Sequence, residues 1–311
     1  RVQVGDRVVL DSVLSCEPRG IPQEGWCEYC RKGDSHLCTY IDRGDLSTGS
    51  VTGFHRETGG GWSPFFLAHE SQCVKVPEGM SDEEAVLVDP VSSALHPVLR
   101  NLPREGSHVA VYGAGIICLL AVADLKAVAP GINVTAIARH DFQARMARKL
   151  GADHVLLDGP TLHQDVAELT EARLFPISMG KPTLEGGFHQ IFDCVGSRES
   201  VDNSLRFLRG QGRLVVVGAA GELQKVDWTP VWFRELQVTG SLCWAQEPHE
   251  GGRRRAFEVS MELIQRKAID LSGLITHRFR IEEYKEALAA AIDKRGHRSI
   301  KVVFNLVKPP S

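Results

Sequence analysis

The sequence predicts an α/β protein in which a doubly wound parallel sheet follows a domain of short strands. Three observations carry this prediction. An apolar run at 108–112 ends in a glycine turn and continues as a helix-like run of Leu and Ala. Over residues 93–243, apolar strands alternate with helices, which is the pattern of a parallel sheet. Residues 1–92 instead show short strand-like runs with turn-rich connections.

Length and composition describe an ordinary globular protein. The 311 residues are enough for two domains of the usual size. The hydrophobic content of 43% and the charged content of 24% are near globular averages, and the longest apolar stretch, Ile116–Ala123, is far shorter than a membrane span. A net charge of -3 gives no electrostatic footprint for nucleic acid. We therefore expect a cytoplasmic protein with neither a membrane nor a nucleic acid as its partner, and we interpret Arg253-Arg254-Arg255 as the solvated start of a helix.

The chain opens abruptly. It begins at Arg1 without a methionine, and Val4–Leu10 reads as a turn that feeds a strand directly. We expect that residues precede Arg1 or that the protein is processed or truncated. Along the chain we expect a first domain over 1–92, a second domain over 93–243, and a return to the first domain over 244–311.

Four of the eight cysteines lie in a polar loop bounded by Cys16 and Cys38. Cys27 and Cys30 form a C-x-x-C pair, Cys38 follows after seven residues, and Cys16 precedes after ten. Zinc binds four thiolates in a tetrahedron, and such a closed site is structural, not catalytic. The loop therefore predicts a structural zinc site, with Glu24 as the competing fourth ligand and ordinary free thiols as the alternative. The other cysteines lie in apolar runs and are interpreted as small buried residues: Cys73, Cys118, Cys194 and Cys243.

The glycine turn after His108–Tyr112 is typical of a dinucleotide-binding crossover. Gly113 permits the tight turn, and Gly115 lets the backbone approach a pyrophosphate, which the first amides of the following helix face. The third fingerprint position is Cys118 in place of glycine, a small residue that can still pack a helix on a strand. Because ligands of parallel sheets lie at the carboxyl ends of the strands, we expect cofactor contacts at the turn and at two later strand ends. These residues are Gly113, Ala114, Gly115, Ile116, Ile117, Cys194, Val195, Gly196, Val217 and Gly218.

The end of the second strand, Asn133–Ala138, indicates which cofactor fits. A carboxylate at this position binds the ribose hydroxyls of NAD and repels a 2′-phosphate. Here Ala138 is followed by Arg139 and His140, with Arg145 nearby. The guanidinium of Arg139 offers a planar pair of donors to phosphate oxygens, so we expect NADP(H), with NAD as the alternative. The competing interpretation is that Arg139 is a solvated loop residue.

The remaining elements follow from the same alternation. Further strands are expected at 154–157, 190–195, 213–217 and 237–242, and a helix at 141–150 is closed by Gly151. The stretch 172–187, which holds several Gly and Pro residues, is expected to be a long loop. After Cys243 we expect a helix near 256–267, a strand near 274–279, a helix over 281–293 and a last strand over 299–304.

Together these pieces resemble the medium-chain, zinc-type alcohol and polyol dehydrogenase superfamily, which includes sorbitol, threonine and glucose dehydrogenases. The resemblance covers the whole chain and rests on several blocks in the right order. Besides the cysteine loop and the glycine turn, these blocks are Gly5-Asp6-Arg7-Val8, Gly59-Gly60-Gly61-Trp62 through Val76-Pro77-Glu78-Gly79, Ser81 to Pro90, Phe192 to Gly196, Gly212 to Gly218, and Ile300 to Phe304.

The resemblance implies a GroES-like catalytic domain joined to a Rossmann cofactor domain. It implies zinc-assisted hydride transfer between NADP(H) and a small-molecule secondary alcohol, polyol or sugar. It also implies a homodimer or homotetramer paired near Ser241–Trp244, since a short apolar edge strand suits pairing with a partner's strand.

Members of the family hold a catalytic zinc with a cysteine and a His-Glu pair, expected at least in part before the Gly5-Asp6-Arg7-Val8 block, and with an acidic or Cys ligand near Asp89. We therefore expect a catalytic zinc only if the upstream segment is present. Asp89 is the remaining candidate catalytic residue, and a plain helix-end charge is its alternative interpretation. We do not assign His69-Glu70 to this pair, because adjacent residues of an expected strand over 65–76 point to opposite faces. Two alternatives stay open: an NADPH-binding protein without zinc catalysis, and a zinc-independent reductase.

Overall fold

The computed structural model describes residues 1–175, 182–249 and 251–306. The chain divides into two compact units, of which the first comprises Arg1–Ser92 with Cys243–Ser311 and the second comprises Ser93–Leu242. Across the described residues, no helix is both long and apolar enough to cross a membrane.

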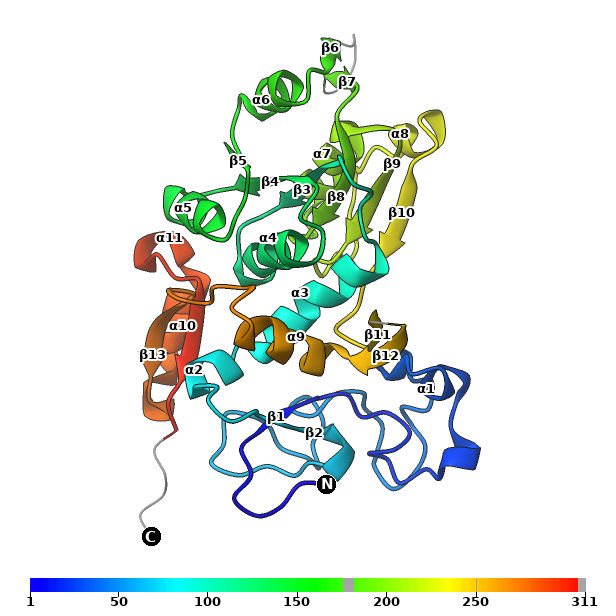
Figure 1. The fold of residues 1–311 in the computed structure, drawn as a ribbon, viewed down its shortest axis with the longest axis vertical. Coiled ribbons are helices and arrows are strands. Elements are labelled where there is room, and N and C mark those ends of the chain that lie inside the picture. The colour runs from blue at the N-terminus through cyan, green and yellow to red at the C-terminus, as the bar shows by residue number, and fades with distance from the viewer. Residues whose placement is uncertain (176–181, 250, 307–311) are drawn as a thin grey trace. The chain divides into compact units, whose positions relative to one another are not determined.

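The second unit is built on a six-stranded sheet in the order β10-β9-β8-β3-β4-β5, and all neighbouring strands in it are parallel (Figure 1). The chain moves outward from β3 to β5, and then returns to β8 and moves outward on the other side to β10. This order confirms the expected doubly wound sheet, and it places the reversal of strand order between β3 and β8, where such sheets bind ligands. The strands are β3 (His108–Tyr112), β4 (Asn133–Ala138), β5 (His154–Leu157), β8 (Phe188–Asp193), β9 (Leu208–Val216) and β10 (Gln237–Gly240).

Helices cover this sheet and bury its central strands. Residues 109–112 of β3 and 134–138 of β4 are all buried, as expected for strands covered on both faces. Phe188, Ile191 and Leu214 join the core from β8 and β9, and Leu205 joins it from α7. The helices of this unit are α4 (Ile116–Val128), α5 (Asp141–Lys149), α6 (Leu162–Leu169), α7 (Arg198–Phe207) and α8 (Thr229–Phe233), while α3 (Val88–Arg100) begins in the first unit and ends in the second.

The prediction of a long loop over 172–187 is wrong at both ends of this range. There the structure has two antiparallel strands, β6 (Arg173–Phe175) and β7 (Thr183–Glu185). Leu174 pairs with Leu184, and both side chains pack on the core of the second unit, which holds the strands in place. Residues 176–181 lie outside the described residues.

In the N-terminal part of the first unit, β1 (Val8–Leu10) pairs antiparallel with β2 (Cys73–Lys75), and the short helices α1 (Glu28–Arg31) and α2 (Asp82–Ala85) follow turns. The 3-10 turns are η1 (Gln23–Gly25), η2 (Ser35–Leu37) and η3 (Glu70–Gln72). The strand expected over 65–76 is therefore confined to its last part. His69 caps η3: its Nδ1 accepts from the Ser71 amide (3.1 Å), and its own amide donates to Gln72 Oε1 (3.1 Å).

The C-terminal part of the first unit contains a β-hairpin, two longer helices, a short helix and a parallel strand pair, whose second strand comes last along the chain. Its elements are β11 (Gln246–His249), β12 (Gly252–Arg255), α9 (Ala256–Gln265), β13 (Ile275–Phe279), η4 (Ile281–Glu283), α10 (Tyr284–Ile292), α11 (Lys294–His297) and β14 (Lys301–Phe304), with β13 parallel to β14.

The arginine run 253–255 is not the solvated start of a helix. It forms strand β12, and each arginine has a defined partner. Arg253 donates to Asp34 Oδ1 (3.0 Å), Arg254 forms an ion pair with Glu262, and Arg255 donates to the Ser71 carbonyl (2.9 Å). The contacts of Arg253 and Arg255 connect the hairpin to segments that are distant in the sequence, which is why the local charge pattern did not predict them.

Candidate functional site

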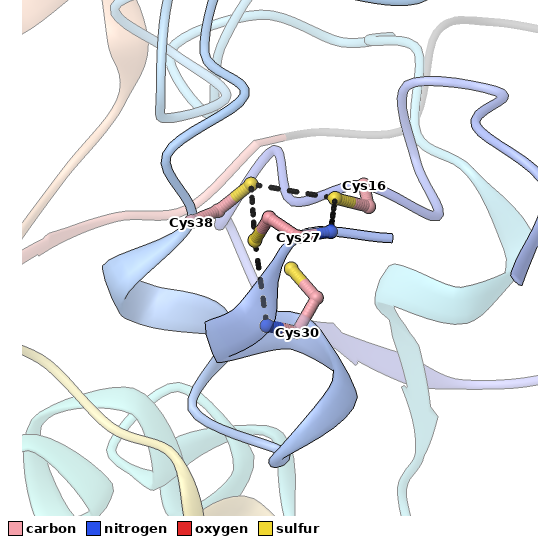
Figure 2. A group of neighbouring side chains, drawn as sticks. All are labelled: Cys16, Cys27, Cys30 and Cys38. Atoms are coloured by element: carbon pink, nitrogen blue, oxygen red, sulfur yellow. Dashed lines mark hydrogen bonds between the residues drawn. The ribbon is translucent and has the colours of Figure 1, made fainter. Parts of the chain in front are cut away.

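Four sulfur atoms come together in the first unit (Figure 2). The Sγ atoms of Cys16, Cys27, Cys30 and Cys38 all lie within 4.8 Å of one another. Cys38 Sγ is 3.7 Å from Cys16 Sγ and 3.9 Å from Cys27 Sγ. A disulfide would require about 2.05 Å, whereas Zn–S bonds of about 2.3 Å in a tetrahedron place the sulfurs about 3.8 Å apart. The cysteines are free, and their spacing fits a structural zinc.

Short local elements position these sulfurs. Cys27 is the N-cap of α1, and its Sγ accepts a hydrogen bond from the Cys30 amide (3.5 Å). The Cys27 amide donates to Cys16 Sγ (3.3 Å), and Cys38 ends the 3-10 turn η2. Backbone donors aimed at sulfur stabilise the thiolate form that binds a metal. The local chain therefore prepares two of the four sulfurs, those of Cys16 and Cys27, to act as ligands.

The surroundings of the cluster are closed and apolar. Cys16, Cys27 and Cys30 are buried, and Ile21, Trp26 and Tyr40 pack against them. The hydrogen bond with the Cys30 thiol lowers the pKa of Cys38 to about 5, whereas burial raises the pKa of Cys16 to about 11. Zinc requires deprotonated thiols, so its binding here would release protons. Glu24 is exposed and is not part of this group.

Arg19 is a structural partner of this loop that the sequence analysis missed. Its side chain is fully buried. Its guanidinium donates to Tyr40 O (2.9 Å) and Ser47 O (2.6 Å), and it also reaches the carbonyls of Ile41 and Leu46. These acceptors lie 21 to 28 residues away in the sequence, so no local pattern could have revealed them. Arg19 thereby ties the turn after Cys16 to the segment after Cys38.

The glycine turn at the end of β3 has the conformation that a pyrophosphate site needs. Gly113 has φ +108, and a Cβ atom on it would lie 2.6 Å from Cys118 Sγ and 2.7 Å from Val195 Cγ2. Gly115 is the N-cap of α4 and has no side chain that could bond to the helix amides. The first amides of α4, which no intrahelical carbonyl satisfies, are therefore available to an anion. Ala114 lies between the two glycines, and Ile116 and Ile117 are the first residues of α4.

A buried carboxylate shapes the next strand end. Asp193, the last residue of β8, accepts from the amides of Val195 (2.9 Å) and Gly196 (3.1 Å) through Oδ1 and from Ser200 Oγ (2.9 Å) through Oδ2. Burial raises the pKa of Asp193. The Asp193 carbonyl also accepts from the amides of Val217 and Gly218, so one residue holds both strand-end loops.

Gly196 and Gly218 let these two loops touch. A Cβ on Gly218 would lie 2.4 Å from Gly196 N and 2.5 Å from the carbonyl carbon of Val195. Gly196 has φ +71, and its Cβ would lie 2.8 Å from Ala220 N. The expected cofactor residues Cys194, Val195, Gly196, Val217 and Gly218 thus lie together at the carboxyl ends of β8 and β9, beside the turn after β3.

Arg139 and His140 follow the end of β4. Arg139 is exposed, and His140 is the N-cap of α5 without a side-chain capping bond. The His140 ring stacks on Phe142 at 5.7 Å. No carboxylate occupies residues 138–140, although Asp141 follows in the first turn of α5. The position is therefore open to a phosphate.

Asp89 lies in the first turn of α3 and lines a cavity of about 600 Å³ in the first unit with Ser12, Thr52 and Phe66 among its neighbours. Burial raises the pKa of Asp89 to about 6. In the part of the chain that the structure describes, the four cysteines form the one group of three or more residues that could hold a metal. Asp89 has no such companions, so the described residues do not fit a catalytic zinc.

Two family models match the chain. One, described as "Zinc-binding dehydrogenase", matches residues 117–266, and the other, "Alcohol dehydrogenase GroES-like domain", matches residues 1–78. L-idonate 5-dehydrogenase of Vitis vinifera is 27% identical over 303 residues, which cover 97% of this chain and 73% of the relative. Sorbitol dehydrogenase of Arabidopsis thaliana is 28% identical over 306 residues, which cover 97% and 74%.

Solved structures share the fold as well. L-idonate 5-dehydrogenase of Escherichia coli superposes with a TM-score of 0.75 at 21% sequence identity, and the match covers 96% of this chain and 75% of that chain. The fold expected from the sequence, a doubly wound sheet joined to a GroES-like domain, is confirmed.

Proposed function

We propose that the chain, which belongs to the medium-chain zinc-dependent dehydrogenase superfamily, transfers hydride between NADP(H) and a secondary alcohol, polyol or sugar. The observation that carries this proposal is the glycine turn at the end of β3, with the uncapped amides of α4 beside the reversal of strand order. Relatives named for idonate and sorbitol support a polyhydroxylated substrate.

In this proposal each residue of the second unit has a binding role. The first amides of α4 hold the pyrophosphate, because their dipole end is positive and no side chain competes for them. Val195, Gly196, Val217 and Gly218 form the wall on the other side of the switch point. When bound, the nicotinamide supplies or accepts the hydride, and the protein positions it.

The first unit carries the remaining roles. The four cysteines hold a structural zinc that keeps the loop folded, in keeping with a closed site. Asp89 contributes a polar group to the cavity that it lines, where it orients a hydroxyl of the substrate. We assign residues 1–92 and 244–311 to the catalytic domain, residues 93–243 to the cofactor domain, and dimer or tetramer contacts to the free edge of β10.

Arg139 decides the choice of cofactor in this proposal, and a charge reversal tests it. Charged hydrogen bonds contribute about 1.5–3 kcal/mol, so Arg139→Asp should weaken NADPH binding at least about tenfold while NADH binding is kept or improves. Titration of nicotinamide fluorescence measures both dissociation constants. Arg148→Asp is the control, because Arg148 is also exposed on the α5 segment but lies two turns further along. An equal loss for both cofactors, or no change, refutes the assignment.

A second candidate function is NADPH binding without zinc catalysis, or reduction that needs no zinc. The observation that favours it is that the described residues contain one metal-ligand group, the four-cysteine cluster. Elemental analysis of the purified chain, together with turnover assays on sorbitol-like polyols, separates the candidates. One zinc per chain with NADPH binding but without alcohol turnover supports the second candidate, whereas polyol oxidation supports the first.

A further inference from the structure

Two cysteines outside the metal cluster meet beneath the glycine turn. Cys118, in the first turn of α4, occupies the fingerprint position where glycine is usual, and its Sγ lies 3.8 Å from Tyr112 O. Cys194, the first residue after β8, donates its backbone amide to the same carbonyl over 3.1 Å. Both cysteines are free. Tyr112 O is thus a common neighbour of the two residues.

The sheet register explains why they meet. Tyr112 of β3 pairs with Asp193 of β8, so the next residues, Gly113 and Cys194, leave the sheet side by side. α4 then turns back over this point and brings Cys118 Sγ against Gly113. Cys194 therefore lies next to Cys118, and the neighbouring Cys118 thiol raises the pKa of Cys194.

We propose that Cys118 and Cys194 are an oxidisable dithiol whose disulfide closes the dinucleotide turn. This inference rests on the proposed cofactor site, because the turn is the one assigned to the pyrophosphate. The oxidant is a peroxide. Cys194 is the entry point, since it is partly exposed while Cys118 is only 4% exposed.

The chemistry balances with hydrogen peroxide as the two-electron oxidant. The Cys194 thiolate attacks one peroxide oxygen, the O–O bond breaks, and the hydroxide that leaves takes a proton to become water. The Cys118 thiolate then attacks the sulfur of the Cys194 sulfenic acid, the S–O bond breaks, and a second water leaves. Because the pKa of Cys194 is raised, little thiolate exists at neutral pH and the reaction is slow.

The disulfide would distort the cofactor site for a steric reason. The two sulfurs must approach to about 2.05 Å, and Cys118 lies in the first turn of α4, whose amides face the phosphates in the proposed site, so the bond would pull on this turn. There is little free space between Gly113 and Cys118, because a Cβ atom on Gly113 would lie 2.6 Å from Cys118 Sγ. We therefore expect the oxidised protein to bind NADPH at least about tenfold more weakly, which is the effect of losing one charged hydrogen bond. By linkage, bound NADPH should shift the dithiol–disulfide equilibrium toward the reduced form.

The test compares NADPH affinity before peroxide treatment, after it, and after reduction with dithiothreitol, for the full chain. Mass spectrometry of digests identifies the cross-linked peptides. Zinc content is measured in every sample, because peroxide can also attack the four-cysteine cluster. Cys118→Gly, which restores the usual glycine, and Cys194→Ala are each compared with their own reduced state. Cys73→Ala removes a cysteine that belongs to neither group and serves as the control.

We expect a disulfide-linked Cys118–Cys194 peptide and a reversible loss of NADPH affinity in the wild type and in Cys73→Ala. Cys118→Gly and Cys194→Ala should lose no NADPH affinity on oxidation. It is overturned if no such peptide forms, or if Cys118→Gly and Cys194→Ala lose affinity as the wild type does. If the reduced wild type fails to bind either cofactor, the proposed function fails instead, while the cross-linked peptide still shows whether the dithiol exists.

Discussion

Asp124 gives the second unit an unusual dependence of stability on pH. It lies in α4 with a side chain that is fully buried, and neither carboxylate oxygen has a hydrogen-bond partner in the described structure. Burial raises the pKa of Asp124 well above its ordinary value, since a charge without a partner is strongly disfavoured in an apolar interior. The folded protein therefore holds a proton on Asp124 that the unfolded chain releases.

The free energy of unfolding depends on pH because the folded and unfolded states bind this proton differently. Below the unfolded pKa, about 3.9, both states are protonated and Asp124 costs no ionisation energy. As the pH rises toward the folded pKa, the free energy of unfolding falls by about 1.4 kcal/mol per pH unit. For a compact unit of about 150 residues, that slope lowers the thermal unfolding midpoint by about 3–6 °C for each increase of one in pH. Asp124→Asn keeps the shape but cannot ionise, so its stability should gain on that of the wild type as the pH rises.

Thermal unfolding of the wild type and of Asp124→Asn at pH 5, 6 and 7 measures this slope. Asp153→Asn provides a matched control, because the contribution of Asp153 to stability does not change between pH 5 and 7. Although burial opposes it, hydrogen bonds from the Val134 amide (2.7 Å) and Lys126 Nζ (3.0 Å) lower the pKa of Asp153. Asp153 therefore stabilises the fold above its unfolded pKa, and this contribution is lost as the pH falls through its folded pKa. Parallel midpoint curves for the wild type and Asp124→Asn would refute the reasoning about Asp124.

Three further substitutions test the site. Arg19→Met should lower the zinc content and the thermal unfolding midpoint, because it leaves several partly buried carbonyls without a donor, at up to about 1–3 kcal/mol each. Elemental analysis and thermal unfolding check this, with the exposed Arg43→Met as control. Gly218→Ala should weaken NADPH binding more than about tenfold, since its Cβ would meet backbone atoms at 2.4 Å and 2.5 Å. Gly221→Ala is the control: its Cβ would have nothing within 4 Å, so this variant should bind NADPH as the wild type does. Asp89→Asn should reduce kcat by about 10²-fold, because the variant loses the carboxylate that orients the substrate hydroxyl. Steady-state kinetics measures kcat and NADPH titration checks cofactor binding; an unchanged kcat contradicts that role.

The sequence by itself predicted the features that depend on neighbouring residues. The apolar run, the glycine turn and the helix that follows it are consecutive, so β3, Gly113 and α4 could be inferred from residues 108–128. The alternation of strands and helices predicted the sheet in the same way. The four cysteines could be grouped because all lie within one loop, although only the folded loop selected Cys16 over Glu24.

Charged and sulfur-containing side chains whose partners are remote could not be assigned from the sequence. Arg19 was overlooked because its carbonyl acceptors come 21 residues or more later, and the arginines 253–255 looked solvated because Asp34 and Ser71 are remote. His69 looked like part of a strand until its capping of η3 was seen.

Tertiary structure alone decided how close the strand ends come. The pattern placed Gly196, Gly218 and Cys194 at the right ends of their strands, but the sheet register brings Cys194 to Cys118 and presses one glycine against the other. Sequence periodicity reports which face of an element is buried. Contacts between elements depend instead on register and crossing geometry, which arise only when the whole sheet has packed.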